Sequence, residues 1–340
     1  MTSLDVRLHD GTAGLVIEVL RGSDEVQERS AQLAALAAPS TVATCRWPWV
    51  SASLARGPAA HPWAVTVLDG TSLVAAAVLL DVDEVGQRIT TLAGTAEGHR
   101  GALLAHDPEA ARALGVGLAA ALQAESRAFV LGPVAQGEAL STLLRCLPED
   151  VAVEPVAIPL LRPRQDVEGE LSKAMRRTLR KARNRLATDS VLVDMDVLDD
   201  GQSVAAALPL ILTIACDRDR TCGRKSPLDD PWLRRLWQNR LLALNSEGTL
   251  RLLTLRLDDE VAAYALCILD GSTLRVLDGR YVERFSRYAP GRLLEAAVLE
   301  RVRGSARLDQ VDWMTTVGPE SLLAANGSDP YVLLRSPARR

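Results

Sequence analysis

The sequence has little that points to an exported, metal-binding or membrane-spanning protein. Its five cysteines are an odd number, lie far apart and include neither a C-x-x-C pair nor a set of zinc ligands. Residues 1–14 carry charges where a signal peptide has an apolar stretch, and no window approaches the roughly 18 uninterrupted apolar residues of a membrane-spanning helix. We therefore expect a cytoplasmic protein with reduced thiols, no bound metal and no membrane partner.

A strong positive charge is also lacking. The formal net charge is −4 at pH 7, so any nucleic acid must be held by a local basic patch and not by the whole surface. Lysine occurs only at Lys173, Lys181 and Lys225, and alanine is very frequent, which is typical of a GC-rich bacterium. Hydrophobic residues (48%) and charged residues (24%) are in globular proportion, and 340 residues suit two domains of about 150 residues each.

The first half alternates between runs typical of strands and runs typical of helices. Asp69-Gly70 separates two β-rich runs and predicts a hairpin that begins a meander. The expected strands cover residues 63–68, 72–80, 88–93, 128–131 and 151–160, and the expected helices cover residues 108–124 and 138–147. Together they indicate a mixed α/β unit.

The second half repeats this order after a polar, proline-containing stretch at residues 162–166. The expected helices cover residues 204–216, 231–244, 291–302 and 320–325, and the expected strands cover residues 250–257, 261–269, 273–277, 310–314 and 331–335. We therefore predict two copies of one α/β fold, in domains of residues 1–165 and 166–340.

A glycine-containing loop in the second half has the features of an anion-binding site. It follows the third meander strand and leads into a helix whose first amide groups lack partners within the helix. These amides and the helix dipole suit the pyrophosphate of coenzyme A or the phosphate of a phosphopantetheine arm. Only the second half has such a loop at this place, although a Pro-Gly turn before an amphipathic helix is also common without any ligand. The residues expected to bind the donor are Arg287, Ala289, Pro290, Gly291, Arg292 and Leu293.

Four parts of the chain are similar to motifs of one bacterial family. They are Trp-Pro-Trp at residues 47–49 with the first hairpin, the basic run of residues 171–181, the Ser-Arg-Tyr-Ala-Pro-Gly-Arg-Leu-Leu loop of residues 286–294, and Val-Asp-Trp-Met at residues 311–314. On these residues the chain resembles the CelD/BcsL-type acetyltransferases of the GNAT superfamily and, more distantly, the Fem peptidyltransferases. The resemblance implies two tandem GNAT-like domains, each with a mostly antiparallel mixed sheet flanked by helices.

The resemblance to Fem proteins is incomplete. These proteins usually carry an aromatic-lysine pair after the strand that matches residues 311–314, and the pair is linked to their use of aminoacyl-tRNA. Residues 320–325 of this chain read Glu-Ser-Leu-Leu-Ala-Ala and contain no lysine. This departure weakens the expectation of a tRNA-dependent mechanism.

Acyl transfer to an amine needs a base for the amine's proton and groups that stabilise an oxyanion. Asp278 follows the third meander strand and Asp312 lies in the later strand, and in this type of fold these strands splay around the thioester, so both are candidate bases. Tyr264, Tyr281 and Tyr288 are candidate acids for the leaving thiolate, and Tyr288, beside the loop, is favoured among them. A surface or turn position for each aspartate and a packing position for the tyrosine are the alternatives. Cys267 alternates inward on its strand and is expected in the core.

A predicted helix from Leu171 to Leu186 has one apolar side and one basic side. Like charges on one helix repel each other unless acidic groups or a polyanion compensate them. The patch therefore indicates an acidic acyl carrier protein, a tRNA acceptor stem or the 3'-phosphate of coenzyme A as partner, with pairing to the protein's own acidic residues as the alternative. Its main residues are Lys173, Arg176, Arg177, Arg180 and Lys181.

These features support one leading hypothesis and two others. The leading one is a biosynthetic N-acyltransferase that moves an acyl group from a thioester donor, acyl-CoA or carrier-bound, to an amine of a small-molecule acceptor. The second is an aminoacyl-tRNA-dependent, amide-forming transferase of the Fem kind. The third is a non-catalytic binding protein that keeps the GNAT-like fold.

Overall fold

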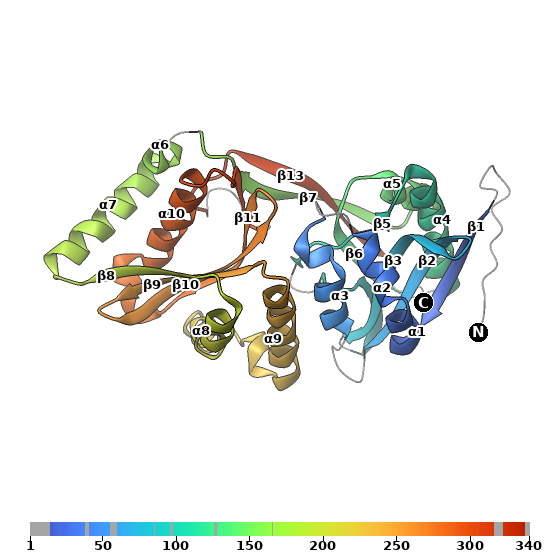
Figure 1. Cartoon of the computed structure of the whole chain (residues 1–340), viewed down its shortest axis with the longest axis horizontal. Helices are drawn as coiled ribbons and strands as arrows, with labels where there is room; N and C mark the ends of the chain where they lie inside the picture. Colours follow the sequence, from blue (N-terminus) through green and yellow to red (C-terminus); the bar gives the residue numbers. More distant parts are fainter. Residues whose placement is uncertain are drawn as a thin grey trace. The chain divides into compact units, whose positions relative to one another are not determined.

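The computed structural model describes residues 14–37, 41–54, 60–84, 86–95, 98–125, 128–164, 166–315 and 322–336 (Figure 1). The chain divides into two compact units. Unit 1 contains Met1–Ala157 and Pro330–Arg340, and unit 2 contains Ile158–Asp329. The expected helix at residues 320–325 begins outside the described residues, and residues 322–325 are not helical.

Unit 1 is built on a meander-type sheet that is covered by helices on both faces. Five of its strands lie in the order β1-β2-β3-β4-β6, antiparallel except for the parallel pair β4 and β6. One core lies under α4 and α5, and a second core lies under α1, α2 and α3. The elements are β1 (Leu15–Arg21), α1 (Gly22–Glu28), α2 (Ser30–Leu36), α3 (Trp47–Leu54), β2 (His61–Asp69), β3 (Ser72–Glu84), β4 (Gln87–Leu92), β5 (Leu104–Ala105), α4 (Pro108–Glu125), β6 (Ala128–Ala135) and α5 (Glu138–Cys146).

Unit 2 repeats this element order, with two helices where unit 1 has three: a strand, helices, a three-stranded meander, a helix and a parallel strand. Figure 1 shows α7 and α10 on one face of its sheet and α8 and α9 on the other. The order of the strands is β8-β9-β10-β11-β12. The elements are α6 (Val167–Glu170), α7 (Lys173–Thr188), β8 (Val193–Leu198), α8 (Gly201–Thr221), α9 (Pro231–Ser246), β9 (Leu250–Leu257), β10 (Glu260–Asp270), β11 (Thr273–Tyr281), α10 (Pro290–Arg303) and β12 (Gln310–Asp312).

Local sequence signals account for several of these boundaries. Ser172, Asp200 and Asp230 cap α7, α8 and α9, and each side chain accepts a hydrogen bond from a backbone N–H of the first turn. The hydrogen bonds from Ser203 lower the pKa of the Asp200 carboxyl. Gly70 turns the β2–β3 hairpin with a left-handed backbone, as expected from its position.

The core position predicted for Cys267 is observed, although β10 is buried on both faces over residues 262–268 and shows no alternation in burial. Cys267 lies in the core of unit 2 with Ala263 and Ala265. Burial raises the pKa of the Cys267 thiol to about 12, because the thiolate would lose its hydration. This cysteine is therefore a core residue and no nucleophile.

Two strands cross the division between the units. β7 (Ala152–Leu161) ends in unit 2, where Leu160 and Leu161 pair antiparallel with β12. β13 (Gly327–Ser336) ends in unit 1, where its residues from Tyr331 onward pair antiparallel with β6. The strand that the sequence assigns to the second domain at residues 331–335 therefore belongs to the sheet of unit 1, because its apolar side chains are buried in the core under α4 and α5.

Shortening Leu334, which has no exposed surface, should destabilise unit 1 although the residue lies near the end of the chain. Leu334→Ala should cost about 2–5 kcal/mol of unfolding free energy, because it removes buried contacts and leaves a cavity. Leu333→Ala is the matched control, since this neighbour is only half-buried. Hydrogen exchange should quicken in β6 for the first variant; faster exchange in β12 with β6 unchanged would contradict this assignment.

Candidate functional site

The parallel strands β11 and β12 pair over a short distance and then separate. Only Thr273, Leu274 and Arg275 of β11 have partners on β12. A register shift against β10 follows, with Leu266 opposite Asp278 and Cys267 opposite Val276, so that Leu277 is an extra, bulged residue. From residue 276 to 281 no described residue pairs with the β12-facing edge of β11.

A buried ion-pair network lies where the two strands still pair. The Arg275 Nε donates to Asp270 at 2.8 Å, and the guanidinium also pairs with Asp312. Asp312 has no exposed surface, and its Oδ1 accepts the N–H of Met314 at 2.9 Å. Burial lowers the pKa of Arg275, but the attraction of the two carboxylates is stronger and raises it overall. Asp312, expected as a catalytic base, is thus placed within a structural network.

The loop after β11 reaches α10 through a left-handed residue. Ala289 has φ 48° and ψ 50°, and its carbonyl accepts from Arg292 N at 3.0 Å and Leu293 N at 3.2 Å. Pro290 has no N–H, and the N–H of Gly291 has no acceptor among the described residues. The expected set of several free amides is therefore reduced to one, at Gly291.

The charged side chains of this loop have partners in the protein. Arg287 pairs with Asp189, the residue that ends α7, and the hydroxyl of Tyr288 donates to the same carboxylate at 2.8 Å. Arg185 of α7 donates to the carbonyl of Arg287 at 2.6 Å. The expected donor loop is therefore tied to the C-terminal end of α7, mainly through Asp189, a residue that the sequence did not single out.

Arg292 also has an ionic partner within the protein. Its guanidinium lies 2.6 Å from Glu295 on the next turn of α10. Burial raises the pKa of the Glu295 carboxyl, and Arg292 only partly offsets this effect. The Leu293 side chain is buried in the core of unit 2.

Asp278 lies on the part of β11 that has separated from β12. Its Oδ2 accepts the hydroxyl of Tyr264 at 2.5 Å, and its Oδ1 lies 2.6 Å from Arg280. Burial and the Asp278 carboxylate raise the pKa of Tyr264 well above its usual value, so the phenol stays a donor. Burial lowers the pKa of Arg280, but Asp278 together with Tyr264 and Asp219 raises it overall. Tyr264 was expected as one of three candidate acids, whereas the sequence did not single out Arg280.

The three expected catalytic residues thus belong to separate hydrogen-bond networks among the described residues. Asp278 is bound by Tyr264 and Arg280, Asp312 by Arg275, and Tyr288 by Asp189. Of the three, only Asp278 combines partial exposure, at 14% of its side chain, with a place on the separated edge. Asp278 is therefore the strongest candidate for a base.

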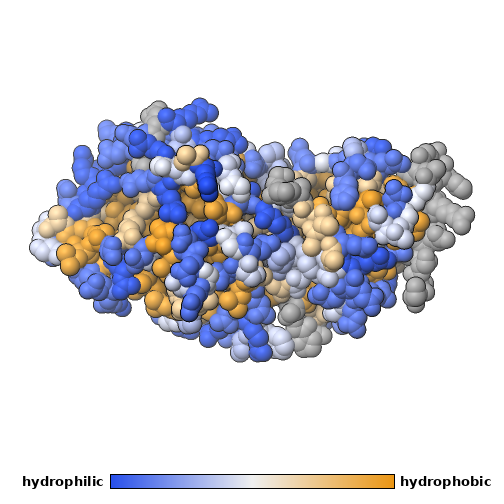
Figure 2. Space-filling model, viewed as in Figure 1, coloured by the Kyte–Doolittle hydropathy of each residue, from blue (hydrophilic) through white to orange (hydrophobic). Residues whose placement is uncertain are grey.

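The basic side of α7 faces away from the core of unit 2. Leu179, Ala182 and Leu186 are buried on its other side. Arg183 pairs with Glu168 at 3.5 Å, and Arg176 donates to the Glu168 carbonyl at 3.1 Å. The remaining charges form an exposed stripe without an ionic partner among the described residues; it consists of Lys173, Arg177, Arg180 and Lys181. Figure 2 shows hydrophilic residues along α7, at the upper left of the view.

The described residues contain neither a cluster of metal ligands nor a helix suited to crossing a membrane. No group of three or more His, Cys, Asp or Glu side chains there is arranged to hold a metal ion. Within the same residues no helix has the length and apolar character that crossing a membrane requires.

Comparison with known proteins identifies the architecture. Residues 173–331 match the family model of the acetyltransferase (GNAT) domain. No curated protein sequence matches the chain. Solved structures do match it, and all three described next share less than 15% identity with it, so they inform on fold alone.

The crystal structure of FemX superposes with a TM-score of 0.53 at 13% identity, covering 92% of this chain and 90% of that one. A tandem GNAT protein from the clavulanic acid biosynthesis pathway gives 0.51 at 14% identity, covering 95% and 99%. A conserved protein of unknown function from Bacteroides thetaiotaomicron gives 0.55 at 11% identity, covering 93% and 100%. The predicted tandem GNAT-like fold is confirmed.

The phenol of Tyr264 should keep its proton where ordinary tyrosines lose it. Its pKa is raised in the folded state, whereas an unfolded tyrosine has a pKa of about 10. The folded state therefore holds this proton more tightly, and the resulting stabilisation is complete below about pH 10 and lost as the pH rises further. An ultraviolet titration should show one of the four tyrosines ionising only as the protein unfolds.

Tyr264→Phe should abolish this late ionisation, and Tyr288→Phe should leave it in place. A late-ionising group that persists in the Tyr264→Phe variant would contradict the account.

Proposed function

The chain has a tandem GNAT fold, and its residues 173–331 match the acetyltransferase (GNAT) domain family. On this premise we propose that unit 2 transfers an acyl group from a thioester donor to an amine of a small-molecule acceptor. The observation that carries the proposal is the unpaired edge of β11 beyond Arg275, which leads to the start of α10. A Cβ atom on Gly291 would lie 3.5 Å from Cδ1 of Tyr281, so the end of this edge adjoins the helix start.

The donor fits this edge for two physical reasons. The N–H and C=O groups of an unpaired strand edge are available to an extended, amide-containing pantetheine arm in the manner of an added strand. The start of α10 offers the Gly291 N–H and the positive end of the helix dipole to a phosphate. Ala289 and Pro290 shape this turn, and Arg287, Arg292 and Leu293 hold it in place through the contacts described above.

The reaction needs one proton acceptor and one proton donor. The amine nitrogen forms a bond to the thioester carbonyl carbon, the C–S bond breaks, and the thiolate leaves with the electron pair and takes up a proton from water. Asp278 is the proposed acceptor of the amine's proton, directly or through a water, with Tyr264 orienting its carboxylate. Because Asp312 has no exposed surface and Tyr288 binds Asp189 away from the separated edge, we assign them to strand pairing and loop anchoring.

The exposed stripe on α7 supports a polyanionic carrier for the donor. Four cations without an ionic partner among the described residues are costly on one helix face unless a partner compensates them. Since α7 is bonded to the donor loop through Arg185 and Asp189, a carrier bound there lies next to the donor site. An acidic acyl carrier protein with a phosphopantetheine arm is the proposed carrier, and coenzyme A alone is the simpler donor.

The same stripe also supports a second candidate function, that of an aminoacyl-tRNA-dependent, Fem-like transferase. Its acceptor-stem phosphates would suit the stripe equally well. The sequence stretch that lacks the Fem-type lysine includes residues 320 and 321, which lie outside the described residues. A non-catalytic binding protein, the third hypothesis, predicts donor binding without turnover.

Donor binding is testable by isothermal titration with acetyl-CoA. Gly291→Leu should weaken binding about tenfold or more, equivalent to about 1.4 kcal/mol, because the side chain occupies the space beside Tyr281. Leucine is a better helix former than glycine, so α10 should persist. The matched control is Gly327→Leu, because a Cβ there meets no atom within 4 Å. Failure of the wild-type protein to bind any coenzyme A thioester would contradict the coenzyme form of the proposal.

The carrier is testable by reversing charge on the stripe. The double variant Arg177→Glu/Arg180→Glu should weaken binding of a purified acyl carrier protein about tenfold at low salt and leave acetyl-CoA binding unchanged, because attraction at an exposed face is long-ranged and screened by salt. The exposed Lys225→Glu is the control.

Fluorescence anisotropy with the carrier protein and, in parallel, with an acceptor-stem RNA hairpin distinguishes the two carriers. Binding of the hairpin alone would favour the tRNA-dependent function. Loss of acetyl-CoA binding in the double variant would instead assign the stripe to the 3'-phosphate of coenzyme A.

A further inference from the structure

The helix that begins at the proposed donor site has no side-chain cap of its own. α10 starts with Pro290, and the residue before it, Ala289, has a left-handed backbone with φ 48°. This conformation costs an alanine free energy that a glycine does not lose. An alanine also has no side-chain oxygen that could accept an amide of the first turn. Ala289 itself therefore provides neither a favoured backbone conformation nor a cap for α10.

Unit 1 provides an internal comparison for this helix start. α4 also begins with a proline, Pro108, but the residue before it is Asp107. The Asp107 Oδ1 accepts the N–H of Ala110 at 2.8 Å, so a local carboxylate caps this helix. The corresponding place before α10 has no carboxylate, and the N–H of Gly291 in the first turn has no acceptor among the described residues. The amide of Gly291 is therefore available to an anion from outside the chain.

In unit 2 a carboxylate far away in the sequence holds the loop before α10. Asp189 pairs with the guanidinium of Arg287 and accepts the hydroxyl of Tyr288 at 2.8 Å. Arg185, on the preceding turn of α7, donates to the Arg287 carbonyl at 2.6 Å. The Tyr288 side chain also packs in the core of unit 2. These contacts fix the two residues directly before Ala289 and thereby the direction in which the chain enters α10.

The position of Asp189 is unfavourable for α7 taken alone. The residue ends this helix, and its N–H bonds to the carbonyl of Arg185 at 2.9 Å. The C-terminal end of a helix carries a partial negative charge, which disfavours a carboxylate there. The contacts with Arg287 and Tyr288, and not the stability of α7, therefore account for an aspartate at this position.

We propose that Asp189 is a positioning residue of the donor site. It holds Arg287 and Tyr288, and through them the left-handed turn at Ala289, so that α10 starts without a capping side chain and the N–H of Gly291 stays available to the donor's phosphate. Asp189 acts through the loop and binds no substrate itself. The inference rests on the proposed donor site in unit 2.

The test combines titration calorimetry with acetyl-CoA and amide hydrogen exchange of the ligand-free full chain. Asp189→Ala should weaken acetyl-CoA binding about tenfold. It should also speed exchange of the Arg292 and Leu293 amides, which bond to the Ala289 carbonyl. Asp189→Asn should weaken binding less, because its amide oxygen can still accept the hydroxyl of Tyr288. Asp199→Ala, which changes an exposed aspartate outside the donor loop, is the matched control.

The variant Ala289→Gly separates positioning from general stability. Glycine adopts the left-handed backbone without steric cost, so in the Ala289→Gly background the loss of binding caused by Asp189→Ala should fall to about threefold or less. A residue that only stabilises the fold would lower the melting temperature and leave acetyl-CoA binding by the folded protein unchanged.

The proposal is overturned if Asp189→Ala binds acetyl-CoA as the wild type does, or if the loss is equal in both backgrounds. If the wild type itself binds no acetyl-CoA, the proposed function fails and this inference fails with it. Unchanged exchange of Arg292 and Leu293 in Asp189→Ala would contradict the anchoring of the loop alone.

Discussion

The buried network of Asp270, Arg275 and Asp312 is the interaction on which the proposed donor site depends. It holds the beginning of β11 against β12 where the strands still pair. Buried charges of this kind require each other, and removing one partner typically costs about 3–5 kcal/mol. Immediately after this point the bulge at Leu277 turns β11 away. Ionic contacts therefore hold the two strands together at the beginning of β11, and the strands are apart beyond Arg275.

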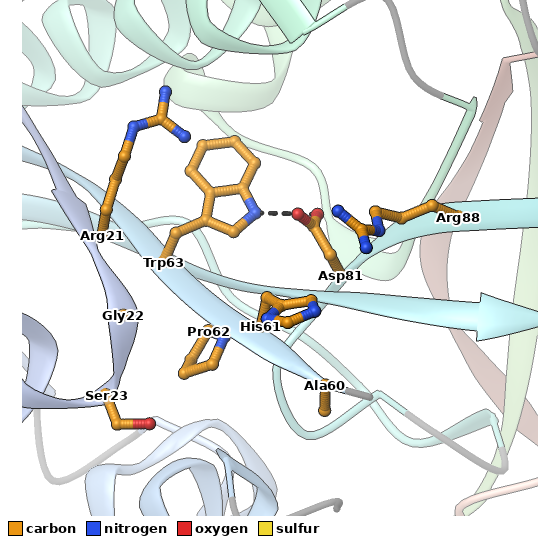
Figure 3. Close-up of a pocket in the computed structure, with 9 residues that line it drawn as sticks. All are labelled: Arg21, Gly22, Ser23, Ala60, His61, Pro62, Trp63, Asp81 and Arg88. Carbon is orange, nitrogen blue, oxygen red and sulfur yellow. Dashed lines mark hydrogen bonds between the residues drawn. The ribbon is translucent and has the colours of Figure 1, made fainter. Parts of the chain in front are cut away.

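The two units share one element order but differ in the contacts of corresponding residues. Both place a buried aspartate opposite a threonine in the meander: Asp270 binds Arg275, and Asp81 accepts hydrogen bonds from Trp63 (Figure 3) and Thr90. Both also have a loop between the meander and the following helix. From the sequence we expected a glycine-containing loop at this place only in the second half. This expectation is wrong, since Gly94, Gly98 and Gly101 all lie between β4 and α4. The case for the donor site in unit 2 rests instead on the separated strands.

Much of the fold followed from local patterns. Hairpin turns such as Asp69-Gly70, the apolar side of α7 and the long helices are encoded within a few residues of each other and were predicted. β1 and β8 were missed because each lies at the edge of its sheet and carries several exposed side chains. The exchange of β7 and β13 between the units was not predictable, because strand pairing between distant segments leaves no local signal.

The candidate site likewise contains some features that could be predicted from the sequence and others that could not. The loop from Arg287 to Leu293 and the basic side of α7 were visible as motifs. Asp189 and Arg280 were not, and the bond of Tyr264, a candidate acid, to Asp278 was not predicted either, since contacts formed by tertiary packing leave no local pattern. Asp312 was recognised as important, but its burial against Arg275 arises from tertiary packing, and this burial favours a role in strand pairing over that of a base.

The central claim is that the unpaired edge of β11 and the start of α10 receive the donor together. Amide hydrogen exchange with and without acetyl-CoA tests it most directly. The account predicts slower exchange confined to residues 276–281 and to Gly291 and Arg292, with β8 and β9 unchanged. Binding of acetyl-CoA that leaves exchange in residues 276–281 unaltered would contradict it.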